Sequence, residues 1–216
     1  MIISFNKDIY EIIGLTLCVT AASIGISAFI GLASGVFIGS RSFRGKKLLT
    51  SVINTLMGLP PVVAGLVVYL FLSRKGPLGS LRLLFTPMAM VIAQVIIISP
   101  IITGLSMAAV KLRHEAVEET CRGLGIGRLK TFLMLAFECR YPLVSALLAG
   151  YGRAVSEVGA VMLVGGNIEH STRVMTTAIV LETGKGEYGN AMALGLILLV
   201  LSFGINWIVQ RFQEGI

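Results

Sequence analysis

Residues 87–110, PMAMVIAQVIIISPIITGLSMAAV, contain no charged side chain. A helix over this stretch is about 36 Å long at 1.5 Å per residue, and the hydrocarbon core of a bilayer is about 30 Å thick. The stretch therefore predicts a membrane-spanning helix. The rest of the chain agrees, because 55% of its 216 residues are hydrophobic and only 13% are charged, unlike the composition of soluble domains.

Four more apolar stretches have spanning length, at residues 12–38, 49–72, 142–165 and 189–209. The first could be mistaken for a signal peptide, but its apolar run is too long and we expect a retained helix. The sequence predicts an all-α, polytopic membrane helical bundle of about five transmembrane helices. Since no polar stretch exceeds about thirty residues, we expect a single domain over residues 1–216.

The formal net charge of +7 is interpreted as loop charge on a membrane protein, not as a nucleic-acid site, so no nucleic-acid partner is predicted. If the loops near residues 40–47 and 111–141 lie in the cytoplasm, eleven Lys or Arg residues are on the cytoplasmic side and six are outside. Positive residues favour the cytoplasmic side. This places the N-terminus outside and the C-terminus in the cytoplasm.

Several small or helix-breaking residues mark the predicted spans. Pro60 and Pro61 in "GLPPVVAG" remove two backbone donors from the second span, which predicts a break covered by protein or a water-filled path. Gly31, Gly35 and Gly39 repeat at a spacing that favours close packing of a neighbouring helix.

Residues 111–141 form the most informative polar stretch. Their apolar residues fall at helical spacing, and the three glycines of "RGLGIG" predict a turn between two short helices. We expect this helix-turn-helix on the inner membrane face, either as a connector held at lipid headgroups or as a docking element. The glycines do not complete a dinucleotide-binding pattern, and the chain has no GxxxxGK[ST] motif.

The stretch "GRAVSEVGAVMLVGGN", residues 152–167, places Arg153 and Glu157 four residues apart inside the fourth predicted span. An unpaired charge at that depth is costly, and the spacing allows an ion pair along one helix face. Two roles stay open for the pair: mutual neutralisation, or a positive charge on an anion path that Glu157 tempers.

Three motifs carry a resemblance to a known family. Glu119 followed by Gly125, and then "LAF" at residues 135–137, resembles the EAA loop of permease subunits of binding-protein-dependent ABC importers. The loop departs from that pattern in "EETCRGLG" and in Glu138, where the family has proline. "GLPPVVAG" is similar to molybdate and sulfate permeases, and residues 152–168 with residues 172–195 resemble tungstate permeases.

The resemblance implies a transmembrane permease subunit of an ATP-driven oxyanion importer, with tungstate as the substrate; molybdate or sulfate is the alternative. The implied partners are a cytoplasmic ABC ATPase, an external oxyanion-binding protein, a second permease copy and membrane lipid. The permease itself would be no enzyme and need no cofactor. The implied coupling residues are Glu118, Glu119, Thr120, Cys121, Gly123, Leu124, Gly125 and Ile126, and those of the translocation path or gate are Pro60, Pro61, Arg153, Ser156 and Glu157.

Two other classes compete with this interpretation. A self-contained channel or carrier would use Arg153 and Glu157 as an ion site. An intramembrane enzyme is poorly supported, because the predicted spans carry no nucleophile with a base, no carboxylate pair and no metal cluster. No metal site is predicted, since Cys18, Cys121 and Cys139 form no ligand spacing and are expected to be free thiols, and His170 is a lone loop histidine.

Overall fold

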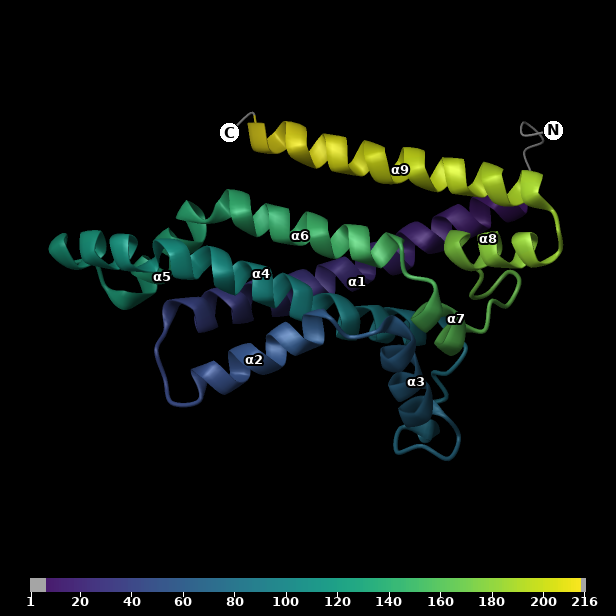
Figure 1. The fold of residues 1–216 in the computed structure, drawn as a ribbon, viewed down its shortest axis with the longest axis horizontal. Helices are drawn as coiled ribbons and strands as arrows, with labels where there is room; N and C mark the ends of the chain where they lie inside the picture. The colour runs from purple at the N-terminus through teal and green to yellow at the C-terminus, as the bar shows by residue number, and fades with distance from the viewer. Residues whose placement is uncertain (1–6, 215–216) are drawn as a thin grey trace. The chain divides into compact units, whose positions relative to one another are not determined.

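The computed structural model describes residues 7–214, and helices account for most of this part of the chain (Figure 1). Its elements, in chain order, are α1 (Lys7–Ser40), α2 (Lys46–Met57), α3 (Pro61–Leu72), the short 3-10 helix η1 (Gly79–Leu81), α4 (Pro87–Gly123), α5 (Arg128–Glu138), α6 (Arg140–Val155), α7 (Gly159–Gly165), α8 (Met175–Gly184) and α9 (Tyr188–Glu214). The prediction of an all-α membrane bundle is confirmed.

Three of these helices, α1, α4 and α9, are long and apolar enough to cross a membrane alone. The number of candidate membrane spans rises to 5 if the bent pair α2 and α3 and the bent pair α5 and α6 each form one span. In the most apolar window of α9 only 6% of the residues are buried inside the protein. This leaves large apolar side chains such as Phe203 and Trp207 exposed, as expected for a surface that meets lipid.

Two sequence predictions of helix boundaries are wrong. Residues 142–165 were predicted as one span, but α6 ends at Val155 and α7 begins at Gly159. The stretch from residue 111 to the glycine turn was predicted as a short helix of its own, but it continues α4 without interruption to Gly123. No glycine or proline lies between Val110 and Gly123, so nothing in the local sequence stops the helix there.

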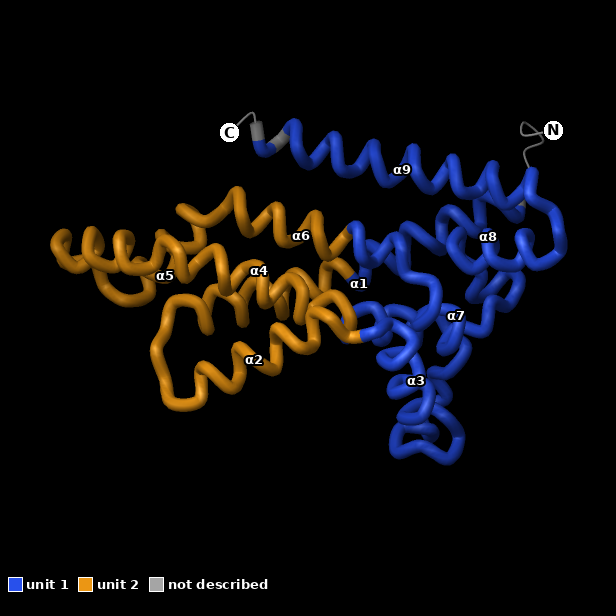
Figure 2. Tube along the Cα trace, viewed as in Figure 1, with its two compact units in different colours: residues 1–23, 60–96, 152–216 blue, residues 24–59, 97–151 orange. Residues whose placement is uncertain are grey.

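The chain divides into two compact units (Figure 2). One contains residues 1–23, 60–96 and 152–216, and the other contains residues 24–59 and 97–151. The chain passes between them within α1, α4 and α6, and also between α2 and α3 at residues 59–60. Each unit is therefore built from segments that are distant in sequence.

In the unit of residues 24–59 and 97–151, the glycines of α1 let α4 approach very closely. A Cβ atom added at Gly31 would lie 2.7 Å from Ile102, and one at Gly35 would lie 2.6 Å from Ser106. These distances are too short for any side chain, so the predicted role of the glycine repeat in helix packing is confirmed. Farther along, Val36, Val110, Leu135, Cys139 and Leu143 form a buried cluster that joins α1, α4, α5 and α6.

In the unit of residues 1–23, 60–96 and 152–216, α3 packs against α7, and α8 packs against α9 (Figure 1). A Cβ atom added at Gly65 of α3 would lie 2.6 Å from the Cα atom of Ala160. Small residues thus bring the two helices into backbone contact. This contact positions the start of α7, next to Glu157.

Candidate functional site

The charged pair of the sequence lies at a break between two helices. Hydrogen bonds at the end of α6 run from the Ser156 amide to Gly152 and from the Glu157 amide to Ala154, at 3.2 and 3.3 Å. The chain then leaves the helix and restarts at Gly159. In the first turn of α7, the Ala160 amide donates to Oε1 of Glu157 at 2.9 Å. A carboxylate at this place accepts a hydrogen bond from an amide that has no partner within the helix. The positive end of the helix also stabilises its negative charge.

The two charges of the pair differ in environment. Nη2 of Arg153 lies 3.7 Å from Oε2 of Glu157, with the Glu157 side chain 3% exposed and that of Arg153 34% exposed. The two side chains form an ion pair, but the distance between these atoms is longer than that of a hydrogen bond. Ser156, between them, is exposed, and its hydroxyl donates to the Arg153 carbonyl at 3.2 Å. The break therefore holds one buried negative charge and one accessible positive charge.

Two uncharged residues that sequence reasoning missed also hold the break. Nε2 of Gln94, from α4, donates to the Ala154 carbonyl at 3.2 Å. The Thr176 hydroxyl, from α8, donates to the Glu157 carbonyl at 3.0 Å. Both side chains are buried. Gln94 is the one amide side chain in the apolar stretch 87–110, and a polar residue in a span generally faces the bundle interior, which is the signal that could have found it.

The paired prolines lie where the second predicted span breaks. Pro60 caps the N-terminus of α3 and Pro61 is its first residue. Proline suits this position because its fixed φ fits the helix and its missing amide hydrogen would have no partner. A Cβ added at Gly159 would lie 2.8 Å from Val62. The helix that the prolines start is thus in contact with the start of α7, next to Glu157.

The predicted coupling residues lie at the turn between α4 and α5. The Ile126 amide donates to the Cys121 carbonyl at 2.8 Å, and the Gly125 amide donates to the Arg122 carbonyl at 3.1 Å. Together with a φ of 67° at Gly125, this is a Schellman motif that ends α4. The predicted glycine turn is confirmed.

Side chains around this turn are mostly accessible. Leu124 is 69% exposed, whereas Cys121 is buried. Glu119, Thr120, Gly123 and Gly125 are exposed, and Glu118 and Ile126 are intermediate. Glu118 pairs with His114 at 3.1 Å and with Arg122 at 2.8 Å. The turn therefore presents both charge and an apolar side chain to its surroundings.

The turn is anchored to the helices on both sides. Leu135 and Cys139 belong to the buried cluster with Val36 and Val110. Nη1 of Arg113, on α4, lies 2.6 Å from Oε1 of Glu138 at the end of α5. Glu138, which departs from the family pattern, thus forms an ion pair between α4 and α5.

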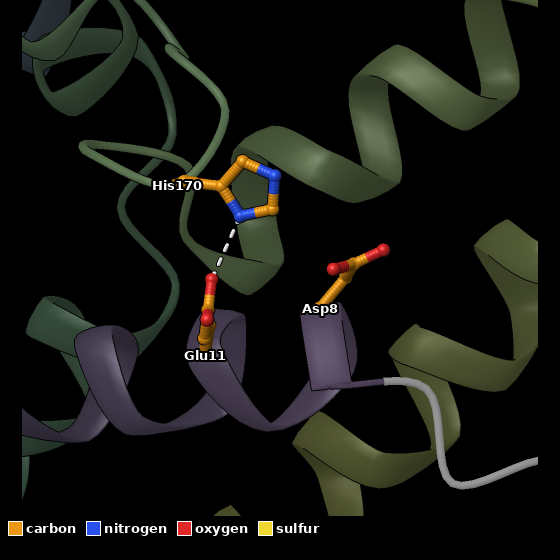
Figure 3. A group of neighbouring side chains, drawn as sticks. All are labelled: Asp8, Glu11 and His170. Atoms are coloured by element: carbon orange, nitrogen blue, oxygen red, sulfur yellow. Dashed lines mark hydrogen bonds and ion pairs between the residues drawn. The ribbon is translucent and has the colours of Figure 1, made fainter.

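A second polar region surrounds His170, in the loop between α7 and α8. Nδ1 of His170 lies 2.8 Å from Oε2 of Glu11, and Asp8 is close by (Figure 3). The possible ligand atoms of Asp8, Glu11 and His170 lie within 4.8 Å of one another. The hydrogen bond to Glu11 raises the pKa of His170, and the negative charges of Glu11, Asp8 and Glu169 raise it further. His170 was predicted as a lone histidine, but its partner comes from a segment distant in sequence.

An open groove of about 760 Å³ runs beside His170 and is lined by Cys18 and Arg173 among others. Cys18 is exposed, whereas Cys121 and Cys139 are buried, and all three are free thiols as predicted. Arg173 pairs with Glu169 at 3.1 Å, and Lys185 pairs with Glu182 at 2.8 Å.

Long apolar helices, a helix break with an ion pair of which one partner is buried, and an exposed, well-anchored turn together fit a polytopic helical membrane permease. Residues 31–216 match the family described as binding-protein-dependent transport system inner membrane component, and the chain belongs to this family. It is therefore a multi-pass membrane protein. Membership also implies a substrate-binding protein and an ATPase as partners.

Individual relatives are similar over nearly the whole chain. The tungstate uptake system permease protein TupB of Peptoclostridium acidaminophilum is 41% identical over 99% of this chain and 94% of its own length. A probable anion ABC transporter permease protein of Haloferax volcanii is 44% identical over 94% of this chain and 90% of its own length. TupB of Campylobacter jejuni is 34% identical over 97% of this chain and 89% of its own length.

Proposed function

We propose that the chain is the transmembrane subunit of an ATP-driven tungstate importer. Tungstate is proposed as the substrate because the chain is 41% identical to a tungstate uptake permease over 99% of its length. The subunit provides the path and the coupling to a separate ATPase and catalyses no reaction itself. Residues 1–216 work as a single permease domain, which is supported by the helices α1, α4 and α6 that continue from one compact unit into the other.

Two copies of the chain form the importer in this proposal, with the N-terminus outside and the C-terminus in the cytoplasm. The orientation rests on the excess of Lys and Arg in the loops near residues 40–47 and 111–141. The loop of residues 166–174 and the groove beside it then face outward. Arg173, Glu182, Lys185 and Glu187 lie on this side and are candidates for contact with the binding protein.

The turn of α4 and α5 contacts the ATPase. Its exposed Leu124 and Glu119 offer apolar and charged contacts. Because Leu135 and Cys139 fix α5 to α1 and α4, a displacement of the turn moves these helices with it. ATP-driven closure of the ATPase would pull the turns together and open the permease pair outward, and hydrolysis would reset it.

The break between α6 and α7 contributes to the oxyanion path. Arg153 supplies an accessible positive charge, while Glu157 reduces its attraction so that the anion is released. Ser156 is exposed at the same place, and α3, which starts at the two prolines, borders α7. Pairing of Arg153 with Glu157 in one transport state, and with the anion in another, would gate the path.

Reconstitution tests this function. The chain is placed in liposomes with its ATPase and binding protein, and ATP-dependent uptake is compared across tungstate, molybdate and sulfate. We expect tungstate to be taken up and to stimulate ATP hydrolysis most strongly. Preference for molybdate or sulfate would contradict the substrate, and oxyanion transport by the chain without the ATPase would contradict the importer.

A further inference from the structure

A small cavity lies beneath the break between α6 and α7, within the unit of residues 1–23, 60–96 and 152–216. Its volume is about 10 Å³, and Thr20, Met90, Gln94, Glu157 and Thr176 are among the residues that line it. By this measure one water molecule needs roughly 10–15 Å³, and it needs two to four polar partners. The cavity therefore has the size of one water molecule and polar walls on several sides.

Gln94 points to a missing partner in this cavity. Its Nε2 donates to the Ala154 carbonyl, which fixes the orientation of the amide and leaves Oε1 as the second polar atom. Oε1 is buried and has no hydrogen-bond partner among the described residues, in a side chain only 4% exposed. Buried acceptors of this kind are normally satisfied by protein or by ordered water.

Glu157 supplies a second acceptor on the cavity wall. Its Oε1 accepts the Ala160 amide, but the distance from Oε2 to Arg153 is 3.7 Å, longer than a hydrogen bond. A buried carboxylate generally needs hydrogen bonds in addition to an opposite charge. Two residues with acceptor oxygens thus line a cavity that has room for one small molecule.

We propose that one water molecule occupies this cavity and donates one hydrogen to Gln94 Oε1 and the other to the Glu157 carboxylate. Thr20, which is 5% exposed, donates its hydroxyl hydrogen to the water oxygen. A neutral donor fits better than a cation, because Arg153 already compensates the charge of Glu157. This site does not depend on the transported substrate.

The water changes what the ion pair can do. When the Arg153 side chain moves away, Glu157 keeps hydrogen bonds to the water and to the Ala160 amide and is not left bare in the protein interior. The water therefore lowers the cost of separating the pair.

X-ray hydroxyl-radical footprinting of the full chain in lipid nanodiscs tests the site, since radicals formed from a bound water oxidise adjacent side chains that bulk solvent cannot reach. Met90 lines the cavity and Met175 does not, and both are 0% exposed. We expect Met90 to be oxidised several-fold faster than Met175. Equal or slower oxidation of Met90 would overturn the proposal.

The variants Gln94→Met and Thr20→Val remove the polar partners at similar side-chain volume. Both are expected to lower Met90 oxidation toward the rate of Met175, and Thr20→Val serves if Gln94→Met does not fold. Unchanged Met90 oxidation in the folded variants would overturn the site. Thermal unfolding of the wild type in sodium and in choline buffers of equal ionic strength should give the same midpoint; a sodium-dependent rise that Gln94→Met abolishes would show a cation in place of water.

Discussion

The chain interrupts its helices in two contrasting ways, at the turn between α4 and α5 and at the break between α6 and α7. The first is exposed and closed by backbone hydrogen bonds around Gly125. The second is held by the buried side chains of Glu157 in the break itself, Gln94 of α4 and Thr176 of α8. An exposed interruption needs only local chemistry, whereas a buried one needs partners for each freed polar group.

The largest effect is expected when the charge balance of the break is removed. Arg153→Ala leaves the buried carboxylate of Glu157 without an opposite charge, at a cost of about 3 kcal/mol. The double variant Arg153→Ala, Glu157→Ala removes both charges and should unfold at a higher temperature than Arg153→Ala. Thermal unfolding in detergent measures the difference. Equal midpoints of the two variants would mean that neutralisation is not the main role of Arg153.

The packing behind the break is the next test. Gly65→Ala introduces a Cβ that would lie 2.6 Å from the Ala160 Cα, and such overpacking costs about 1–3 kcal/mol. Gly152→Ala is the matched control, because a Cβ there meets nothing within 4 Å. We expect a lowered unfolding midpoint for Gly65→Ala alone. Similar midpoints would show that α3 and α7 separate at little cost.

A substitution in the exposed turn should affect stability less but transport strongly. Gly125→Asp forces a non-glycine residue into the left-handed region, at a cost of about 1 kcal/mol, and adds bulk and charge at the proposed ATPase contact. We expect membrane insertion to persist and ATP-dependent uptake to be lost.

Two further variants separate strain from contact in this turn. Gly125→Asn tolerates the positive φ better and should keep more stability than Gly125→Asp. Gly123→Asp adds the same charge where φ is not positive and space is open, so it should unfold near the wild-type temperature. Normal uptake by Gly125→Asp would contradict the coupling role of the turn.

The smallest effect is expected at His170, where a long-range contact is exposed. Its pKa is raised above the ordinary value of about 6.5, so protonation is favoured in the folded state. The stabilisation is fully present below about pH 6.5 and is lost as the pH rises through the folded-state pKa. Thermal unfolding from pH 6 to pH 9 should show a small downward trend that His170→Gln removes. An identical trend in the variant would assign it to other groups.

The same comparison explains what the sequence could and could not predict. The turn at Gly125 and the helix break at Pro60 and Pro61 were predictable, because glycine and proline act through their own backbone geometry. The five apolar stretches were also visible, since spanning length depends only on a run of residues. These features are all local.

The break at residues 156–158 could not be predicted in this way. Its flanking sequence is small and apolar, and the carboxylate that caps α7 looked like half of an intrahelical ion pair. Gln94 and Thr176 reach it from helices distant in sequence. Sequence spacing could place Arg153 beside Glu157, but only tertiary structure shows which of the two charges is buried.

The three thiols differ in exposure, so the unaltered chain can be labelled at a single cysteine. With Cys121 and Cys139 buried and Cys18 exposed on the wall of the groove beside His170, a thiol-reactive fluorophore would attach at one position without any engineered cysteine. Its emission would report any change in the surroundings of Cys18 on that wall.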